Sequence, residues 1–379
     1  MKIAIDCREA NTKAGIGRLT YSLISEVIKI DKKNKYILLL SDEDAFPEIK
    51  NKNVKKLIFK GAKKAVKKPY WQFVYLPYIL KKEKVDIFFS PNNFVTPPFF
   101  QGKTIVTIQD LVPLVYKDYL NNFFDKIKYQ LRVTLTAIRE PHKVMTISKF
   151  SKDEIKRLMK IAEEKIFIIN EAIDKRIYQL KPNLEVLNSL GITKPYILGM
   201  GGMEIRKNNK RLIEAFISMI QKNKEFRHTL VIVGTEKSKK TPSSGEVVIP
   251  EGLSGRVMFT GSVSDSQLAT LYSQAEIFIY PSLYEGFGLP PLEAMSYKVP
   301  VITSNSSSIP EVVRDSAILI NPKSVKDIER AMTKLIKNKS LQKTLIQKGL
   351  ENIKDFSWER AAQTLISEFE KLIKDDGKI

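Results

Sequence analysis

The chain has 379 residues, 43% of them hydrophobic and 28% charged, an ordinary composition for a globular protein with room for two domains. Its 63 lysines and arginines exceed its 42 acids by 21. The single cysteine excludes an intrachain disulfide framework. The two histidines leave little material for a histidine-based metal site or a Ser-His-Asp triad. No apolar run approaches the roughly 20 residues that span a membrane, and Asp6 argues against a signal peptide. We therefore expect a cytoplasmic protein, either free or peripheral on the inner leaflet of the cell membrane.

Short apolar runs alternate with amphipathic stretches along the first half. A glycine turn and a helix from about Arg18 to Ile30 follow the first strand, and a later helix begins near Ser148 or Ser151, either of which can cap it. The predicted strands are Lys2–Asp6, Tyr36–Leu40, Val54–Phe59, Val85–Phe89, Thr104–Ile108 and Val144–Ile147. Such alternation predicts a parallel sheet covered on both faces.

The same pattern restarts in the second half, with a glycine turn and a helix from about Asn208 to Gln221 after its first strand. The predicted strands are Tyr196–Gly199, Thr229–Val233, Val257–Phe259, Ile277–Ile279, Val299–Ile302 and Ala317–Ile320. We expect an α/β protein with two parallel-sheet domains, at 1–175 and 176–355. The last segment, 356–379, should be a helix that packs back on the N-terminal domain.

The basic excess is concentrated in residues 1–178, which carry 35 basic and 20 acidic side chains. Lys50–Asp86 alone holds 12 lysines and two acids, together with the aromatic residues Tyr70, Trp71, Phe73, Tyr75 and Tyr78. Basic charge beside aromatic rings suits anionic lipid, nucleic acid or a phosphorylated substrate. The alternative is the solvated surface of a lysine-rich protein.

Two glycine turns are candidates for phosphate binding, because each joins a strand to a helix whose first N–H groups are unpaired. Gly15-Ile16-Gly17-Arg18 lacks the third glycine of a dinucleotide fingerprint, so a purely structural turn is equally compatible with it. In the turn that begins at Gly199, Arg206 and Lys207 stand at the start of the next helix. Cations are disfavoured there unless an anion binds, which favours a diphosphate site.

The segment Tyr280–Met295 combines a strand end, a glycine-containing loop and a helix that begins at Pro290-Pro291. Glu285 lies in the loop and Glu293 eight residues later on the helix. Two acids at a strand end can accept hydrogen bonds from sugar hydroxyls. Glu293 could instead be an exposed helix residue, and a glycosidase pair is a further alternative that no other motif supports.

These residues resemble the retaining glycosyltransferases of family 4, in which an E-x7-E element matches Glu285–Glu293. The resemblance covers nearly the whole chain, and the R-K-N form is similar to mannosyltransferases of lipopolysaccharide and other surface glycans. Further matching segments are Gly15–Arg18, Trp71-Gln72, Leu76-Pro77, Ser90–Asn92, Thr107–Pro113, Thr146–Ser151, Arg206–Asn208, Val233-Gly234, Gly261–Asp265, Pro281-Ser282 and Ile309–Val312. The family implies a GT-B fold, with two Rossmann-like domains that face a cleft.

The resemblance implies a nucleotide-sugar donor. Arg206 and Lys207 would bind its diphosphate, Glu285 its sugar and Glu293 its ribose, with Asp110 a further catalytic residue. The remaining implied contacts are Val263 and Asp265 at the base, the Phe287-Gly288-Leu289 backbone over sugar and phosphate, and Gly15 and Gly17 at the phosphate. The acceptor, a lipid-linked saccharide or another glycan, would bind the basic N-terminal half and draw the protein to an anionic membrane surface.

The implied mechanism is same-face transfer, in which the leaving phosphate takes the acceptor's proton and the site acts through electrostatics. It needs neither a metal nor another cofactor. The run Asp42-Glu43-Asp44 imitates a metal-binding D-x-D motif, but we interpret it as a solvated turn. Gln109 stands where the family commonly has the histidine that donates to the sugar, and an amide cannot carry charge.

Alternatives remain at this point. The donor could be GDP-mannose, our first expectation, or a UDP- or dTDP-sugar that carries glucose, N-acetylglucosamine or rhamnose. Gln109 makes a non-catalytic partner subunit with the same fold conceivable. Net charge alone suggests a nucleic-acid-binding protein, but no recognition motif supports it and we expect no nucleic-acid partner.

Overall fold

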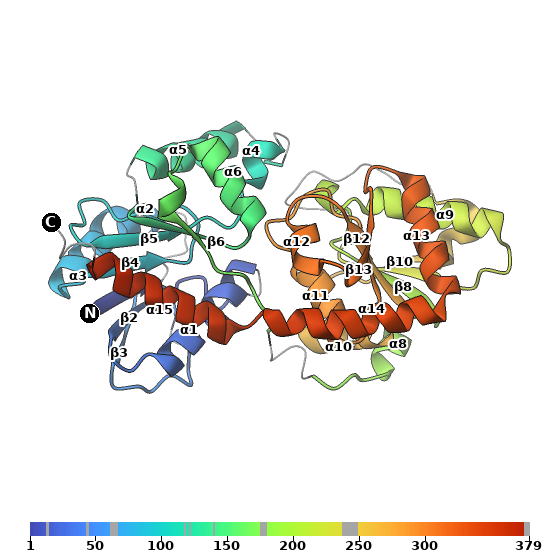
Figure 1. The fold of residues 1–379 in the computed structure, drawn as a ribbon, viewed down its shortest axis with the longest axis horizontal. Coiled ribbons are helices and arrows are strands. Elements are labelled where there is room, and N and C mark those ends of the chain that lie inside the picture. Colours follow the sequence, from blue (N-terminus) through green and yellow to red (C-terminus); the bar gives the residue numbers. More distant parts are fainter. Residues whose placement is uncertain are drawn as a thin grey trace. The chain divides into compact units, whose positions relative to one another are not determined.

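The computed structural model describes residues 1–12, 15–42, 45–60, 67–116, 119–120, 123–138, 141–174, 180–236 and 249–374. The chain forms two compact units, each described by itself. The first unit comprises Met1–Leu111, Ile127–Glu171 and Ser357–Ile379, and the second comprises Val112–Lys126 and Ala172–Phe356. Figure 1 shows a sheet with helices around it in each unit.

The first unit contains a seven-stranded parallel sheet in the order β3-β2-β1-β4-β5-β6-β7. Its strands are β1 (Lys2–Asp6), β2 (Lys35–Leu40), β3 (Val54–Ile58), β4 (Ile87–Ser90), β5 (Lys103–Thr107), β6 (Lys143–Thr146) and β7 (Ile166–Ile168). The predicted parallel sheet is confirmed. The sequence patterns missed β7, because three residues are too few for a periodic signal.

Helices cover both faces of this sheet. On one face, Trp71, Leu76 and Leu80 pack in a buried cluster with Ala4 and Phe88. On the other, α15 packs against α1, and Phe369 meets Phe89 edge to face with ring centroids 5.9 Å apart. The helices are α1 (Gly15–Ile30), α2 (Lys67–Tyr70), the π-helical turn η1 (Trp71–Tyr75), α3 (Leu76–Lys82), α6 (Lys149–Met159), the 3-10 turn η2 (Glu163–Lys165) and α15 (Trp358–Lys374), with α5 (Phe123–Ile138) belonging partly to each unit.

The helix start predicted near Ser148 or Ser151 is resolved in favour of Ser148. Its side-chain oxygen accepts a hydrogen bond from the backbone N–H of Ser151 at 3.0 Å, so Ser148 is the cap of α6.

The second unit contains a six-stranded parallel sheet in the order β10-β9-β8-β11-β12-β13. Its strands are β8 (Tyr196–Met200), β9 (Thr229–Val233), β10 (Val257–Phe259), β11 (Ile277–Tyr280), β12 (Val301–Ser304) and β13 (Ala317–Ile320). All six were predicted. The strand predicted from Val299 begins two residues later, after Pro300, which has no N–H to donate to a ladder.

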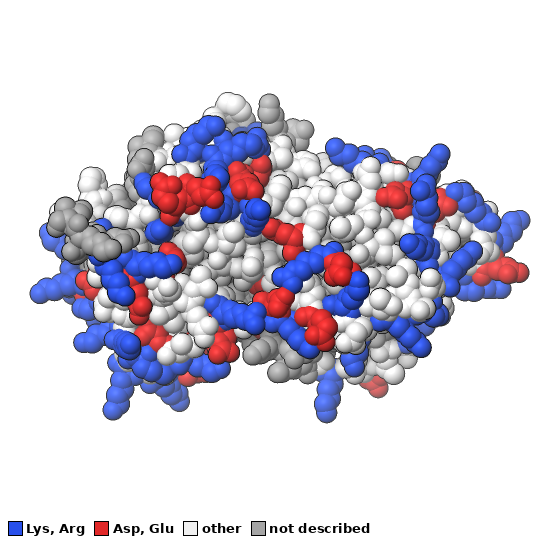
Figure 2. Space-filling view, viewed as in Figure 1, with Lys and Arg blue, Asp and Glu red and all other residues white. Residues whose placement is uncertain are grey.

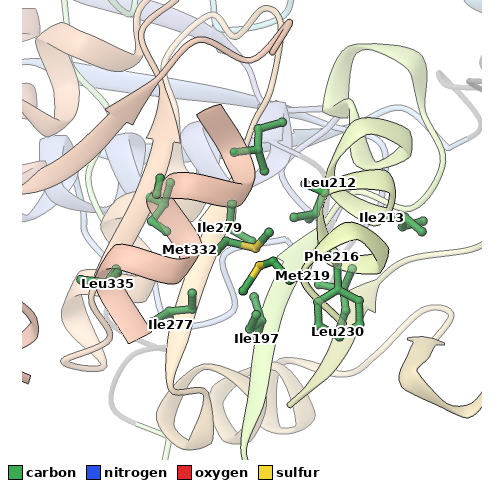
Figure 3. Close-up of a cluster of buried hydrophobic side chains, with 14 of the residues drawn as sticks. Ile197, Leu212, Ile213, Phe216, Met219, Leu230, Ile277, Ile279, Met332 and Leu335 are labelled. Carbon is green, nitrogen blue, oxygen red and sulfur yellow. The ribbon is translucent and has the colours of Figure 1, made fainter. Parts of the chain in front are cut away.

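Figure 3 shows one core of this unit, in which Leu212, Phe216 and Met219 of α9 and Met332 of α13 belong to one buried cluster with Ile197 of β8. Alternate strand residues point to the opposite face, where helices α10 and α11 pack. The helices are α4 (Val112–Val115), α8 (Glu185–Ser189), α9 (Asn209–Lys222), α10 (Asp265–Gln274), α11 (Leu289–Ser296), α12 (Ile309–Val313), α13 (Val325–Lys337) and α14 (Lys339–Asn352), with 3-10 turns η3 (Ile205–Lys207), η4 (Glu251–Arg256) and η5 (Ile353–Asp355).

The strand order fixes where a ligand can bind in the second unit. Its order reverses between β8 and β11, and parallel sheets bind ligands outside the carboxyl ends of strands at such a switch point. The loops that follow β8 and β11 carry Arg206, Lys207 and Glu285.

Surface charge is distributed over the face seen in Figure 2, where basic side chains appear over many elements with acidic ones among them. No helix in the described part of the chain is long and apolar enough to cross a membrane.

Candidate functional site

The loops after β8 and β11 are joined by backbone hydrogen bonds. The N–H of Leu283 donates to the carbonyl of Arg206 at 2.7 Å, and the Ser282 hydroxyl reaches the same carbonyl at 2.9 Å. The turn that bears the two cations is therefore held directly against the loop that bears Glu285.

The backbone conformation and hydrogen bonds of Asn208 explain why an asparagine follows the two cations. Its φ of +60° lies in the left-handed region, which asparagine tolerates better than most residues. The side-chain amide donates to the carbonyls of Pro281 at 3.0 Å and Pro322 at 2.6 Å. This residue thus ties the start of α9 to the loops after β11 and β13.

The glycines after β8 are required by the chain itself. Gly201 has a φ of +101°, and a Cβ there would overlap the aliphatic part of Lys207. Gly202 and Gly234 approach each other so closely that a Cβ on either would overlap backbone. The tight turn predicted from the sequence therefore exists, and its first role is to make room for the Lys207 side chain.

Glu285 is the centre of a buried polar cluster. Its Oε1 accepts hydrogen bonds from the Tyr280 hydroxyl at 2.6 Å, the Ser282 hydroxyl at 2.7 Å and Lys207 Nζ at 2.8 Å. Its Oε2 accepts one from Arg206 Nη1 at 2.8 Å. The Glu285 side chain is only 10% exposed.

The charges of this cluster stabilise one another. Burial alone would raise the pKa of Glu285, but Arg206 and Lys207 outweigh that effect and lower it to about 2. Burial and the neighbouring Arg206 cation lower the pKa of Lys207. Glu204 also pairs with Arg206, so two carboxylates balance two cations. The sequence predicted an anion beside Arg206 and Lys207. In this structure the carboxylates of Glu204 and Glu285 supply that negative charge.

Serines after β12 hold the Glu285 loop, a feature that the sequence reasoning missed. The N–H of Glu285 donates to the Ser307 hydroxyl at 2.9 Å, and Ser307 has a left-handed φ of +54°. The Ser308 hydroxyl lies 2.9 Å from the Glu285 carbonyl and 2.6 Å from that of Phe287. The run of serines before Ile309 was the available signal.

Glu293 lies on α11 and is 6% exposed, so its interpretation as an exposed helix residue is wrong. The Tyr272 hydroxyl, from α10, donates to its Oε2 at 3.0 Å. Tyr272 was not predicted, since an aromatic residue in the last turn of a helix gave no signal.

The chain from Phe287 to Leu289 forms the entry to α11. Phe287 is buried and packs edge to face on Phe356, with centroids 5.6 Å apart. Gly288 has a φ of +122°, and a Cβ there would lie 2.6 Å from Ile309 Cδ1. Glycine is thus required where the chain turns into the helix.

Val263 and Asp265 follow β10 in the chain, and both are half-buried. Asp265 is the first residue of α10, and Ser264 before it forms a reciprocal capping box with Gln267. An acid in the first turn stabilises a helix whatever else it binds.

The other predicted residues belong to the first unit. A Cβ on Gly17 would overlap Thr12, whereas a Cβ on Gly15 would meet no described atom within 4 Å; Lys13 and Ala14 lie outside the described residues. Asp110 is half-buried after β5. Beside it, the Gln109 N–H donates to Asn93 Oδ1 at 3.1 Å, while its buried Nε2 has no partner among the described residues.

Potential metal ligands lie apart from one another in the part of the chain that the structure describes. Of the acidic run, Asp42 accepts hydrogen bonds from Asn11 and Ser41, and Glu43 and Asp44 lie outside the described residues. In the described ranges, no group of three or more His, Cys, Asp or Glu side chains could hold a metal ion.

The two histidines make local contacts. Nε2 of His228 lies 2.8 Å from Glu276, and Nδ1 of His142 lies 3.2 Å from the Thr104 N–H.

Comparison with known proteins points to one family. The family described as Glycosyl transferases group 1 matches residues 185–352, which contain the whole Glu285 cluster. The chain is 29% identical over 298 residues to the O-antigen chain mannosyltransferase B of Escherichia coli, covering 78% of this chain and 77% of that protein. It is 29% identical over 278 residues to the serotype-specific mannosyltransferase WbdA of Escherichia coli, covering 72% of this chain but only about a third (34%) of that protein.

Solved structures share the fold over nearly the full length. Sucrose-phosphate synthase from Thermosynechococcus elongatus superposes with a TM-score of 0.72 at 17% identity, covering 99% of this chain and 100% of that one. The Anabaena protein HepE in complex with UDP-glucose gives 0.71 at 16% identity, covering 98% and 100%. At such identities these matches establish the fold alone.

Proposed function

We propose that this chain, a member of the group 1 glycosyltransferases with the GT-B fold, transfers a hexose from a nucleotide sugar to a lipid-linked or polysaccharide acceptor with retention of anomeric configuration. The observation that carries this proposal is the convergence of Arg206, Lys207 and Glu285 at the switch point of the second sheet. Two cations suit a diphosphate, and a carboxylate beside them suits sugar hydroxyls.

The chemistry proposed for the site is electrostatic. Arg206 and Lys207 would stabilise the charge that develops on the leaving diphosphate, and Glu285 would orient the sugar. In same-face transfer the leaving phosphate accepts the acceptor's proton, so no side-chain base is needed. Glu285 suits the orienting role, because its lowered pKa keeps it an acceptor at neutral pH.

Mannose from GDP-mannose is the first proposal for the donor. It is supported by similarity to proteins named as O-antigen mannosyltransferases of Escherichia coli. A UDP-sugar is the alternative, supported by the shared fold of a protein solved with UDP-glucose. A dTDP-sugar remains a third option.

A calorimetric panel of GDP-mannose, UDP-glucose, dTDP-rhamnose and the free diphosphates tests the donor site. We expect one base to bind and Lys207→Ala to weaken that binding roughly 10- to 100-fold, the effect of losing a hydrogen bond to a charged group. Lys222→Ala is the matched control, because Lys222 also pairs with a glutamate, Glu329, but lies at the end of α9. Absence of binding by every nucleotide contradicts the proposal.

Turnover separates an enzyme from a non-catalytic subunit. Release of the nucleoside diphosphate with a lipid-linked acceptor would establish transfer, and a product whose anomeric configuration, read by NMR, equals that of the donor sugar would establish retention. Binding without release would instead favour the partner-subunit alternative that Gln109 suggested. A salt-sensitive gel shift with DNA and no nucleotide-sugar binding would favour the nucleic-acid alternative.

The acceptor side of the proposal rests on the first unit. Tyr70, Phe73, Val74 and Tyr78 are each 50–57% exposed along α2, η1 and α3, and we call them the aromatic face. Lys82 Nζ lies 5.7 Å from the centre of the Tyr78 ring. Exposed aromatic groups beside lysines suit an anionic membrane surface, where a lipid-linked acceptor would be found.

Vesicle flotation tests the aromatic face. We expect binding to vesicles containing phosphatidylglycerol, weaker binding to pure phosphatidylcholine, and loss of most binding in Phe73→Ser with Tyr78→Ser. Leu184→Ser is the control, since Leu184 is 60% exposed in the second unit. Unchanged flotation of the double variant would exclude the aromatic face as the membrane contact.

A further inference from the structure

The two oxygens of the Glu285 carboxylate are used unequally. Oε1 accepts from Tyr280, Ser282 and Lys207, whereas Oε2 accepts, among the described residues, from Arg206 alone. A carboxylate offers about four acceptor positions shared by its two oxygens. Oε1 is therefore saturated, and Oε2 keeps acceptor capacity for another donor.

The direction of the Tyr280 hydrogen bond follows from counting protons. Its hydroxyl contacts Glu285 Oε1 and Lys207 Nζ. An ammonium group can only donate, so the phenolic hydrogen goes to Glu285. Burial and the Glu285 charge raise the pKa of Tyr280 well above its ordinary value, which keeps that hydrogen in place.

Ser282 is a less dedicated donor to the same oxygen. Its single hydroxyl hydrogen has three acceptors within reach, the carbonyls of Arg206 at 2.9 Å and Tyr284 at 3.3 Å as well as Glu285 Oε1 at 2.7 Å. Tyr280 is thus the neutral residue whose only acceptor in the cluster is Glu285.

Tyr280 is also held rigidly. It is the last residue of β11 and is fully buried, and its ring stacks with Phe278 at a centroid separation of 6.1 Å. Thr303 of β12 donates to its carbonyl at 2.8 Å. A phenol fixed in this way can hold a carboxylate in one orientation.

We propose that Tyr280 is a positioning residue, which fixes Oε1 of Glu285 so that Oε2 is the oxygen presented to a sugar hydroxyl. The sugar in this statement rests on the proposed function, whereas the orientation of Glu285 does not. Tyr280 acts through Glu285 and is given no contact with substrate.

A double-variant cycle tests the coupling in the enzyme. We expect Tyr280→Phe to lower kcat about 10-fold or more, as for a hydrogen bond to a charged group, with KM changed less than about threefold. Because Tyr280 acts only through Glu285, Tyr280→Phe with Glu285→Gln should be no slower than Glu285→Gln alone. Multiplying losses would overturn the proposal.

Tyr196→Phe is the matched control. The Tyr196 hydroxyl is buried in the same unit and donates to the Leu271 carbonyl at 2.7 Å, but Tyr196 starts β8 at the opposite end of that strand from the site. This variant should lower the unfolding temperature as much as Tyr280→Phe does while kcat stays unchanged. An equal fall of kcat in both variants would indicate a structural role and contradict the proposal.

A second measurement needs no substrate. In protein labelled with ¹³C at glutamate carboxyls, the Glu285 signal is the one missing from Glu285→Gln. We expect it to stay at the carboxylate position from pH 7 to pH 4 in wild type and to begin titrating within this range in Tyr280→Phe. Identical titrations would overturn the positioning role even if no nucleotide binds, whereas a shifted titration with no nucleotide binding would contradict only the proposed function.

Discussion

Tyr272 and Glu293 form a buried hydrogen bond that joins α10 to α11, with the phenol donating to Oε2 over 3.0 Å. Burying a carboxylate costs free energy unless its oxygens are hydrogen-bonded. A fixed donor can satisfy one oxygen while a ligand satisfies the other. The family resemblance assigns the ribose contact to Glu293, and Tyr272 is the residue that holds its carboxylate in place.

Glu293→Gln should abolish recognition of ribose hydroxyls. We expect wild type to bind the preferred nucleoside diphosphate about 10- to 100-fold more tightly than its 2′,3′-dideoxy form, since the carboxylate would accept from both hydroxyls. In Glu293→Gln the two ligands should bind nearly alike. Titration calorimetry of both ligands checks this, and full discrimination in the variant would remove Glu293 from the ribose site.

Asn208→Ala should destabilise the second unit by about 2–3 kcal/mol, because it strains a left-handed backbone and leaves two buried carbonyls unpaired. Asn208→Gly removes the strain and keeps the loss of hydrogen bonds, so it should recover part of the difference. Lys160→Gly is the control for backbone strain alone, since Lys160 has a φ of +58° at the end of α6. Urea unfolding of the three variants measures these effects, and equal stability of wild type and Asn208→Ala would refute the bridging role.

Gly201→Ala should affect Lys207 more than any other side chain. A methyl group there would overlap the Lys207 stem, and a φ of +101° is strained for alanine. We expect a loss of about 1–3 kcal/mol in unfolding free energy and a weaker nucleotide affinity. Gly252→Ala is the comparison, because its added Cβ would meet nothing within 4 Å. A Gly201→Ala variant with normal affinity would show that Lys207 does not hold the diphosphate.

Apolar runs were sufficient to predict most strands of the two sheets, because strands buried on both faces leave continuous hydrophobic segments. Ile277–Tyr280, for example, reads as one uninterrupted run and forms β11. The same signal fails for β7, which has three residues, and for the π-helical turn of Trp71–Tyr75, whose conformation has no sequence period to recognise.

The candidate site, like the fold, could be predicted from the sequence only in part. Arg206, Lys207 and Glu285 were predicted as separate roles from motifs, and the structure brings all three into one cluster. That they neutralise one another could not be predicted, because side-chain pairing depends on the loop connections after β8 and β11. Tyr280 and Ser307 escaped notice for the same reason, since a buried hydroxyl is informative only once its acceptor is located.

Glu276 should make the second unit sensitive to acid. Hydrogen bonds from His228 at 2.8 Å and from Lys339, working against its burial, lower the pKa of Glu276 to about 2. Because this folded-state pKa lies below the unfolded value of about 4.3, the stabilisation is complete above pH 4.3 and is lost as pH falls toward 2.

Glu276→Gln should therefore unfold about 1–2 kcal/mol more easily at pH 7, a figure reduced for the exposure of Lys339, and the difference from wild type should shrink as pH is lowered from 5 to 3. Denaturant unfolding at four or five pH values measures it. Glu351→Gln serves as the control, because Glu351 pairs with Lys354 on an exposed helix end and should leave the profile unchanged. A constant difference at all pH values would mean that Glu276 stabilises the unit by packing, with its charge contributing nothing.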